Sequence, residues 1–406
     1  MIERVAPEHR LRIAVVGDLD GVHTQSWLRY FVARGHDVHG VSYGTPARPP
    51  EGVRVHALRS SEGGRPRPGA RPGLTSRIGR ALPPGLQRLV NLLRYRSAGI
   101  RRAVDEIDPD VLHGHFLVEH ALYGTAAARR PYVVSAWGSD VLVEAARSRL
   151  NRAIARFVLG RADLATANNR HMAREMVVRL GKERAWVQHI VLGVERAFLD
   201  GAPEHVNARA SDDAPPTVIS TRSLDTPLYN VDTIVRAMAR VRQEHATARL
   251  VVVGEGRLRP RLEALAVELG LGEAVRFAGF VSQEELRDEL SRAHVFVSVP
   301  SSDATSVALL QAMGAGCYPV VSDLPSQEEL VQEGRGARVP VRDEAALAHA
   351  IAAALDDRDR RREAVGRNRA FVEEYGMLEP NMARMEAWYY RLAGRSSEVA
   401  PPEAGP

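Results

Sequence analysis

The chain has 406 residues, enough for two domains with separate cores, and its 45% hydrophobic and 26% charged content is typical of a globular protein. Its single cysteine excludes an intramolecular disulfide. No run approaches the roughly 18 apolar residues that a membrane-spanning helix needs, and the start of the chain lacks the apolar stretch of a signal peptide. We therefore expect a cytoplasmic protein.

Basic charge is concentrated in the first half, although the net charge is only +5. From Arg65 to Arg102 the chain has ten arginines and no acidic residue. Over residues 86–104 these arginines alternate with leucine, valine and isoleucine, a pattern typical of an amphipathic helix. Such a helix can lie on an anionic membrane or cover a sheet with its arginines in water. The stretch lacks the aromatic interleaving of a base-stacking surface, so we expect no nucleic-acid partner.

The first half alternates strand and helix patterns. Strands are predicted at residues 11–16, 37–42, 110–113 and 132–135, and a helix from about residue 23 to 34. A linker-like run at 210–216 precedes a second series of strands at 217–220, 249–254, 275–279, 294–300, 314–323 and 339–341, with helices at 231–245 and 257–269. This alternation predicts an α/β fold of two Rossmann-like domains with doubly wound parallel sheets. Ligands are then expected in a cleft at the carboxyl ends of the strands.

Residues 294–323 contain a binding motif in one continuous stretch. An apolar strand ending in Pro300 is followed by a polar turn at 301–306, a helix at 307–313 and another strand. The first N–H groups of a helix have no partner within it and favour anions, diphosphates included. An ordinary crossover with a capped helix has the same local pattern, so this segment alone does not decide between the two interpretations.

Several motifs in sequence order resemble the retaining GT-B glycosyltransferases of family 4. In the second half they are Arg222 after the first strand and the segments 253–262, 275–281, 293–301 and 311–321. The first half adds the segments 34–38, 110–115 and 136–140. Each motif alone is weak, but their order and spacing together are specific.

The resemblance implies a GT-B architecture, with a nucleotide-diphosphate sugar bound by the second half and a glycan or lipid-linked acceptor bound by the first. It implies domains at residues 1–205 and 206–376, a helix at 377–395 that crosses back to the first domain, and a disordered tail at 396–406. It also implies sugar transfer with retention of configuration. No cofactor or metal is expected.

The resemblance also implies roles for individual residues. Arg222 and the N–H groups at Thr305, Ser306 and Val307 stabilise charge on the leaving diphosphate, and Asp303 holds a hydroxyl of the donor sugar. The other donor-binding residues are Gly254, Gly256, Tyr229, Val281 and Gln311. On the acceptor side we expect His23, Trp137 and Asp140.

The chain departs from the family pattern at four positions. The two family glutamates fall on Asp303 and Gln311, the lysine falls near Tyr229, and a histidine of the first half is Trp137. Gln311 and Tyr229 can form hydrogen bonds but carry no charge. Two alternatives therefore stay open: a nucleotide-sugar epimerase of the same fold, and a non-catalytic nucleotide-sugar-binding protein.

Two further patterns suggest metal binding only weakly. Asp18 and Asp20 form an Asp-x-Asp motif, and His113 and His115 share one face of a strand end, but neither pair has an evident third ligand. The resemblance suggests instead that the basic stretch from Arg65 to Arg102 brings the protein to the inner face of the membrane, where lipid-linked acceptors lie.

Overall fold

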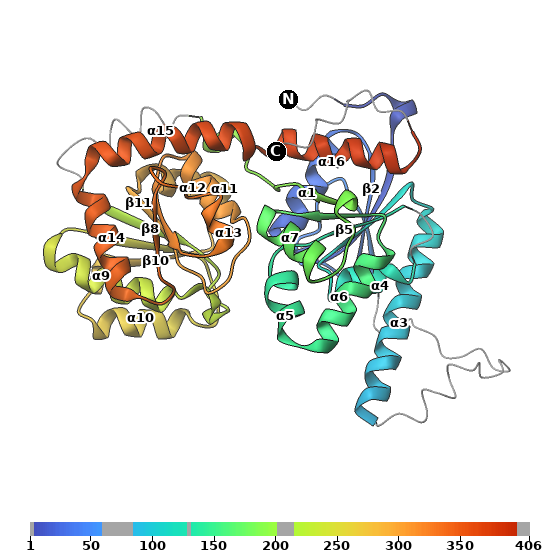
Figure 1. Ribbon diagram of the computed structural model, residues 1–406, viewed down its shortest axis with the longest axis horizontal. Helices are drawn as coiled ribbons and strands as arrows, with labels where there is room; N and C mark the ends of the chain where they lie inside the picture. Colours follow the sequence, from blue (N-terminus) through green and yellow to red (C-terminus); the bar gives the residue numbers. More distant parts are fainter. Residues whose placement is uncertain (1–3, 59–83, 128–130, 201–214, 396–406) are drawn as a thin grey trace. The chain divides into compact units, whose positions relative to one another are not determined.

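The computed structural model describes residues 4–58, 84–127, 131–200 and 215–395, leaving out the side chains of residues 84–95. The chain divides into two compact units: unit 1 consists of residues 1–190 and 382–406, and unit 2 of residues 191–381. Each unit has its own parallel sheet with helices on both faces (Figure 1). The predicted fold class of two doubly wound α/β domains is confirmed.

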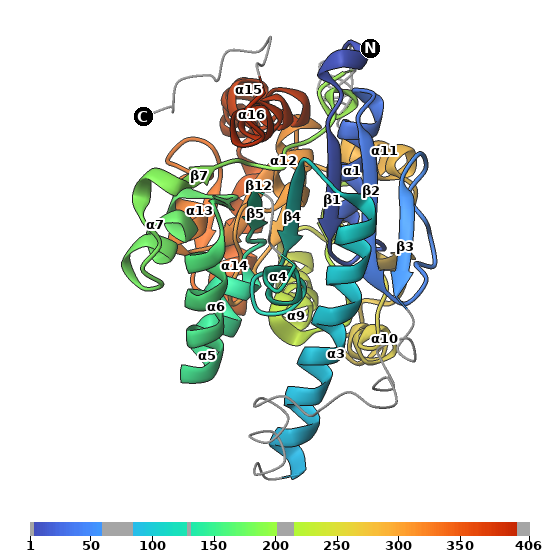
Figure 2. The same cartoon turned by 90° about the vertical axis from the view of Figure 1, so that its right-hand side faces the viewer.

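Unit 1 is built on a seven-stranded sheet with the order β3-β2-β1-β4-β5-β6-β7 (Figure 2). Its strands are β1 Arg12–Val16, β2 Asp37–Tyr43, β3 Arg54–Leu58, β4 Val111–His115, β5 Tyr132–Ser135, β6 Leu164–Ala167 and β7 Val187–His189. Its helices are α1 Val22–Ala33, α3 Pro84–Ile107, α4 His120–Thr125, α5 Ala145–Arg147, α6 Arg149–Arg161, α7 Arg170–Val178 and, near the end of the chain, α16 Leu378–Leu392. The central strands β4 and β5 are buried along their whole length because helices cover both faces of the sheet.

Unit 2 is built on a six-stranded sheet with the order β10-β9-β8-β11-β12-β13. Its strands are β8 Thr217–Thr221, β9 Arg249–Val253, β10 Val275–Gly279, β11 Val295–Ser298, β12 Tyr318–Ser322 and β13 Ala337–Val339. Its helices are α9 Val231–Glu244, α10 Arg259–Glu268, α11 Gln283–Arg292, α12 Val307–Gly314, α13 Pro325–Glu328, α14 Glu344–Asp356 and α15 Arg358–Tyr375. Among the described residues, no helix combines the length and the apolar character required to cross a bilayer.

Each sheet has a topological switch point next to its first strand. In unit 1, β1 lies between β2 and β4, and in unit 2, β8 lies between β9 and β11. In unit 2 the chain therefore continues from β8 toward one edge of the sheet and from β11 toward the other edge. Ligands of open α/β sheets bind at such a point, outside the carboxyl ends of the strands. In unit 2 the switch point brings Arg222, which follows β8, next to residues 299–306, which follow β11.

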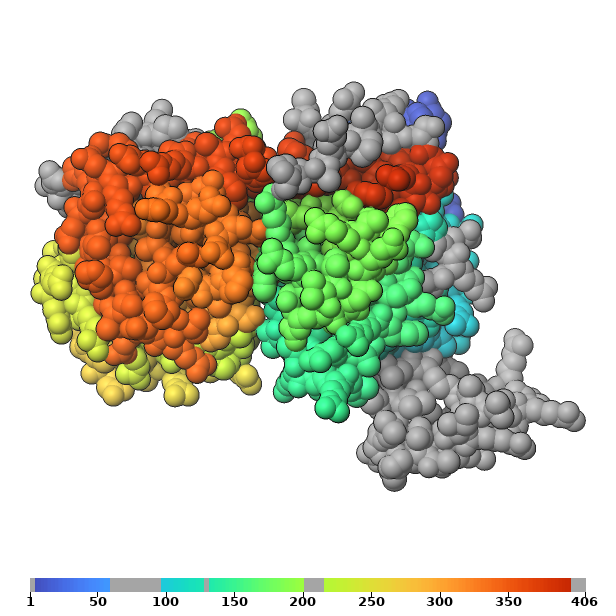
Figure 3. Space-filling model, viewed as in Figure 1, coloured from blue at the N-terminus to red at the C-terminus, as the bar shows by residue number. Residues whose placement is uncertain are grey.

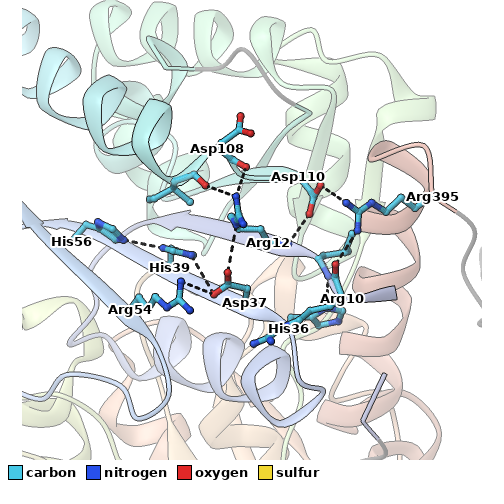
Figure 4. A network of polar contacts seen from close by, with 12 residues as sticks. Arg10, Arg12, His36, Asp37, His39, Arg54, His56, Asp108, Asp110 and Arg395 are labelled. Carbon is cyan, nitrogen blue, oxygen red and sulfur yellow. Dashed lines mark hydrogen bonds and ion pairs between the residues drawn. The ribbon is translucent and has the colours of Figure 1, made fainter. Parts of the chain in front are cut away.

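The amino-terminal edge of the unit 1 sheet is occupied by a polar network (Figure 4). Asp110 accepts hydrogen bonds from the Arg12 amide at 2.7 Å and from Arg395 at 2.8 Å. Asp37 lies 3.4 Å from Arg12 and 3.3 Å from His39, whose other ring nitrogen is 2.9 Å from His56. These contacts connect the starts of the strands to each other and to Arg395 after α16, and leave the carboxyl-terminal edge for ligands.

Helix α16 packs its aromatic residues into unit 1. Tyr389 is fully buried and accepts a hydrogen bond from the Trp27 indole at 3.2 Å. Glu386 is also buried, and it accepts hydrogen bonds from Tyr30 at 2.9 Å and Arg34 at 2.9 Å. The ring of His36 lies 2.9 Å from the same carboxylate. The Leu11 amide donates a hydrogen bond to the other ring nitrogen of His36, so the ring nitrogen that faces Glu386 carries the hydrogen and donates a hydrogen bond to the carboxylate.

The structure differs from the predicted domain boundary at residue 205. The segment that follows β7 belongs to unit 2, because Val194 pairs with Met377 and both Phe198 and Leu199 lie in a hydrophobic core of unit 2. The predicted crossing helix at 377–395 is α16, Leu378–Leu392. The predicted tail at 396–406 and residues 65–83 of the basic stretch lie outside the described residues.

Candidate functional site

Arg222 is the centre of a polar cluster at the switch point of unit 2. Its Nε donates to Ser298 Oγ at 2.8 Å, and its Nη2 donates to Asp303 at 2.5 Å and to Ser306 Oγ at 2.8 Å. The guanidinium also lies 5.0 Å from the centre of the Tyr229 ring. The side chains of Arg222 and Asp303 are 11% and 16% exposed, so a ligand can reach the cluster while most of it is screened from water.

The Asn230 side chain fixes the loop that follows β11. The Asn230 side chain is buried and donates to the Val299 carbonyl at 2.8 Å and to Ser301 Oγ at 2.9 Å. Its carbonyl oxygen accepts from Arg342 Nε at 3.1 Å. Asn230 itself has a positive φ of 49°, a conformation that asparagine adopts more readily than most residues. The loop that carries Asp303 is therefore fixed before any ligand binds.

Helix α12 starts at the same cluster. Its N-cap is Ser306, whose hydroxyl accepts from the Leu309 amide at 3.2 Å while it accepts from Arg222. Thr305 and Ser306 are both buried, and Val307 is the first helical residue. The positive end of the α12 dipole and the Arg222 guanidinium thus lie together, an arrangement that favours a diphosphate.

Gly254 and Gly256 shape the wall of this site. Both have positive φ, 144° and 153°. A Cβ atom on Gly254 would lie 2.1 Å from the Arg222 carbonyl oxygen, and one on Gly256 would lie 2.2 Å from the Leu224 carbonyl carbon. Both glycines therefore allow the loop after β9 to pack directly on the backbone that carries Arg222. Their predicted contact with a donor stays a prediction.

We expect Gly254→Ala to destabilise unit 2 by on the order of 3 kcal/mol, because the substitution adds a clash with backbone to an unfavourable φ. The matched control is Gly366→Ala on α15, where a Cβ meets nothing within 4 Å. That change should stabilise the protein by roughly 0.5–1 kcal/mol, the usual gain of alanine over glycine inside a helix. Urea unfolding of both variants measures the difference, and equal stabilities would contradict the packing role of Gly254.

The other predicted donor-side residues lie around the cluster. Tyr229 packs against the Arg222 guanidinium and against the core below it, so it supports Arg222 from the position where the family has a lysine. Gln311 is half-buried on α12 and donates to Gln283 at 3.3 Å. Val281 packs against the apolar core that includes α12. Ser298 and Asn230 were not predicted as site residues, although both hold its geometry.

In unit 1 the structure brings two of the predicted acceptor-side residues together. His23, in the first turn of α1, stacks on Trp137 after β5, with ring centres 5.4 Å apart and an interplanar angle of 25°. Trp27 and His115 meet Trp137 nearly at right angles. His23 is exposed and Trp137 half-buried, so the pair forms an aromatic surface at the carboxyl ends of the strands.

Asp140 has a different place from the one predicted. Its carboxylate is fully buried and accepts hydrogen bonds from the backbone N–H groups of four residues: Leu117, Trp137, Gly138 and Val141. Burial raises its pKa above the ordinary value, and these backbone bonds counteract part of the rise. Because the side chain is enclosed, we assign Asp140 to shaping the Trp137 loop, not to touching an acceptor.

The two weak metal patterns have structural explanations. Asp20 accepts hydrogen bonds from the amides of Ala47 and Arg48, which fixes a neighbouring loop. His113 lies between Tyr389 and Ser135, and His115 faces Thr24 at 3.1 Å. In the part of the chain that the structure describes, no three histidine, cysteine or acidic residues could hold a metal ion together.

The buried histidines of unit 1 make its stability depend on pH. Burial lowers the pKa of His115 to about 3 and that of His189 to about 4, and it holds the pKa of His113 well below its ordinary 6.5. Below pH 6.5 the unfolded chain therefore binds protons that the folded unit does not. The folded state loses stability as the pH falls, by up to about 1.4 kcal/mol per pH unit for each histidine.

We expect the free energy of unfolding of unit 1 to fall steeply between pH 6.5 and 5.5, and His189→Asn to reduce that slope, because it removes one of the histidines whose pKa burial lowers. Urea unfolding followed at several pH values measures both effects. A stability that does not change over this range would show that the histidines are protonated in the folded state as well.

Comparison with known proteins shows that the chain is similar to glycosyltransferases. Residues 21–198 match the family model Glycosyltransferase Family 4, and residues 202–370 match the model Glycosyl transferases group 1. The D-inositol 3-phosphate glycosyltransferase of Acidothermus cellulolyticus is 28% identical over 64% of this chain and 63% of its own length. A GDP-mannose-dependent alpha-(1-6)-phosphatidylinositol dimannoside mannosyltransferase of Mycobacterium tuberculosis is 31% identical over 35% and 36%. The matched stretches span about a quarter to just under two thirds of the curated relatives' lengths.

Solved structures share the fold over nearly the whole chain. Anabaena HepE, solved in complex with UDP and glucose, superposes with a TM-score of 0.72 over 93% of this chain and 98% of its own, at 16% identity. Sucrose-phosphate synthase from Thermosynechococcus elongatus gives 0.75 over 95% and 100%, at 19% identity. The two glycosyltransferase models thus match consecutive parts of the chain, and its fold is that of the GT-B glycosyltransferase structures to which it is similar.

Proposed function

We propose that the protein transfers a sugar from a nucleotide-diphosphate sugar to a glycan or lipid-linked acceptor, with retention of configuration. The observation that carries the proposal is the Arg222 cluster of unit 2. A guanidinium and the N-terminus of α12 meet at a switch point, where they can hold a diphosphate. This site binds the leaving group, which is where negative charge grows during transfer.

Transfer breaks the bond between the anomeric carbon and the diphosphate oxygen and forms a bond from that carbon to an acceptor hydroxyl oxygen. The acceptor proton passes to the departing diphosphate, so the protein supplies no separate base. Arg222 and the first amides of α12 stabilise the charge on the diphosphate. Asp303, in the loop that precedes α12, is the group that we assign to a hydroxyl of the donor sugar.

The comparisons support the classes of donor and acceptor. The relatives include a GDP-mannose-dependent enzyme that acts on a phosphatidylinositol mannoside, and structural neighbours were solved with UDP and with UDP-glucose. We extend nucleotide-sugar use to this chain on these grounds. A lipid-linked acceptor would place the protein at the cytoplasmic face of a membrane, and the net charge of +5 suits an anionic surface.

Two alternatives give different products. A nucleotide-sugar epimerase would interconvert sugars on the nucleotide, and a binding protein would hold the donor without turning it over. The second is favoured by Gln311 and by the absence of a lysine near Tyr229, since Lys182 is the only lysine of the chain. Incubation with UDP-, GDP- and ADP-sugars, followed by mass spectrometry and NMR, distinguishes them. Slow hydrolysis of a donor to its α-sugar supports retaining transfer, whereas an epimerised donor or an inverted sugar contradicts it.

A thermal-shift screen of free nucleotides should identify the base first. A nucleotide that binds only the folded state raises the melting temperature by mass action, by an amount that depends on its concentration relative to its Kd. We expect one nucleoside diphosphate to shift the melting temperature more than the corresponding monophosphate, because Arg222 and α12 act on the diphosphate. Equal shifts for the two would contradict the assignment of the site.

A further inference from the structure

The outer side of α5 and α6 in unit 1 combines exposed apolar residues with a dense row of arginines. Residues 145–162 contain five arginines and no acidic residue. Leu150 and Phe157 are 61% and 53% exposed, among the highest values for large apolar side chains in the described parts of the chain. Both helices lie at the outside of unit 1 (Figures 1 and 2), and the space-filling view shows their surface open (Figure 3).

The spacing along α6 separates two faces. Ala155, Val158 and Leu159 are buried against unit 1, and they hold the helix in place. Leu150, Ala153, Phe157 and Gly160 follow at intervals of three or four residues and form a strip on the opposite, exposed face. The helix therefore has a second apolar face that the packing of unit 1 does not use.

Arginines border this strip on both sides. Arg149, Arg156 and Arg161 are exposed, and Arg147 on α5 has 74% of its side chain in solvent, with one nitrogen 3.6 Å from the Glu144 carboxylate. The Arg161 guanidinium lies 5.9 Å from the Phe157 ring centre. Long arginine side chains can lie along an apolar surface while their charged ends reach phosphates.

Two of the three described arginines of α3, the helix first expected to meet a membrane, contact other residues of unit 1. Arg96 lies between the rings of Tyr43 and Tyr123, 5.0 and 5.1 Å from their centres. Arg101 donates to the Ala126 carbonyl through two nitrogens, at 3.1 and 2.8 Å. Ile100 and Val104 on the same helix are buried. This end of α3 covers the sheet.

We propose that the outer face of α5 and α6 docks on the surface of a bilayer containing anionic lipids. Leu150 and Phe157 enter the headgroup region, and Arg147, Arg149 and Arg161 bind lipid phosphates. An amphipathic helix with arginines beside leucine and phenylalanine suits the interface between headgroups and acyl chains. A nucleic acid or an acidic protein would satisfy the arginines but leave the two apolar side chains without a partner.

This proposal is independent of the sugar transfer reaction and can be tested without a substrate. The full chain is sedimented with vesicles of phosphatidylcholine alone and of phosphatidylcholine with phosphatidylglycerol, at two salt concentrations. We expect binding only to the mixed vesicles. The double substitution Leu150→Ser and Phe157→Ser should weaken binding at least tenfold, and Arg147→Gln with Arg149→Gln by roughly fivefold for each charge at low salt.

The matched controls are exposed residues of unit 2: Val267→Ser on α10, and Arg236→Gln with Arg249→Gln. Both should bind vesicles within about twofold of the wild type. Thermal unfolding of each variant establishes that it is folded. Binding that both α5–α6 variants retain would overturn the proposal and move membrane contact to residues 65–83 or elsewhere. Absence of wild-type binding, or a change of oligomeric state alone in the apolar variant, would overturn it too.

Discussion

Replacing Arg222 by alanine is expected to lower kcat by about 30- to 1,000-fold, the usual cost of removing one group that stabilises transition-state charge in a screened site. The guanidinium is positioned before the substrate binds, because Ser298, Asp303 and Ser306 hold it from three sides. Its charge therefore meets the diphosphate without reorganisation. The measurement is steady-state kinetics with the donor that the nucleotide screen identifies.

The control variant for Arg222→Ala is Gln311→Ala. Gln311 carries no charge and should bind the donor equally in the ground and transition states, so its loss should raise KM and leave kcat nearly unchanged. Arg222→Lys keeps the charge but loses the planar fork that reaches three partners, and it should recover only part of the rate. If Arg222→Ala and Gln311→Ala both changed KM alone, Arg222 would have no role in the transition state.

Glu386→Ala should cost unit 1 about 3–5 kcal/mol of stability, because it leaves the buried His36 and the half-buried Arg34 without the carboxylate that they surround. For a unit of this size we expect a melting temperature lower by about 6–20 °C. The matched control is Glu373→Ala, since Glu373 forms an exposed ion pair with Arg196 at 2.9 Å. That change should cost less than about 1 kcal/mol. Equal losses of stability in the two variants would contradict the inference that Glu386 on α16 stabilises unit 1.

The Glu386 contribution has a definite pH dependence. Burial alone would raise its pKa, but hydrogen bonds from His36, Arg34 and Tyr30 outweigh burial and lower the pKa below its ordinary 4.5. A carboxylate whose folded pKa is depressed stabilises the protein above its unfolded pKa and loses that contribution as the pH falls through the folded value. The stability difference between wild type and Glu386→Ala should therefore be constant near neutral pH and shrink below about pH 4.5.

The fold could be predicted from the sequence where local patterns are strong. β5 and β10 begin and end at the predicted residues. β5 is a mostly apolar run that follows Pro131, and β10 is a short run rich in apolar residues that ends at Gly279. β3, β6 and β7 were not predicted. β6 has the sequence Leu-Ala-Thr-Ala, which carries little strand preference, and β3 is only half-buried at the sheet edge. Their pairing with neighbouring strands, and not their own sequence, makes them strands.

For the candidate site, too, the sequence predicted the main residues but not the tertiary contacts that position them. The motif resemblance pointed to Arg222, Asp303 and Ser306, and the structure brings them together although Arg222 lies more than 80 residues from the other two in the chain. It could not show that Asn230 supports the loop or that Asp140 is enclosed by four amides, because both depend on tertiary contacts. The roles of the site residues in transfer stay predictions until kinetics are measured.

The most direct test of the central claim is release of a nucleoside diphosphate from UDP-, GDP- and ADP-sugars by wild-type protein and Arg222→Ala, measured side by side. We expect release from at least one donor, faster with an acceptor present, and a loss of about 30-fold or more in the variant. A wild-type protein that binds a donor tightly but releases no diphosphate under any condition would contradict it. So would a variant that turns over as fast as the wild type.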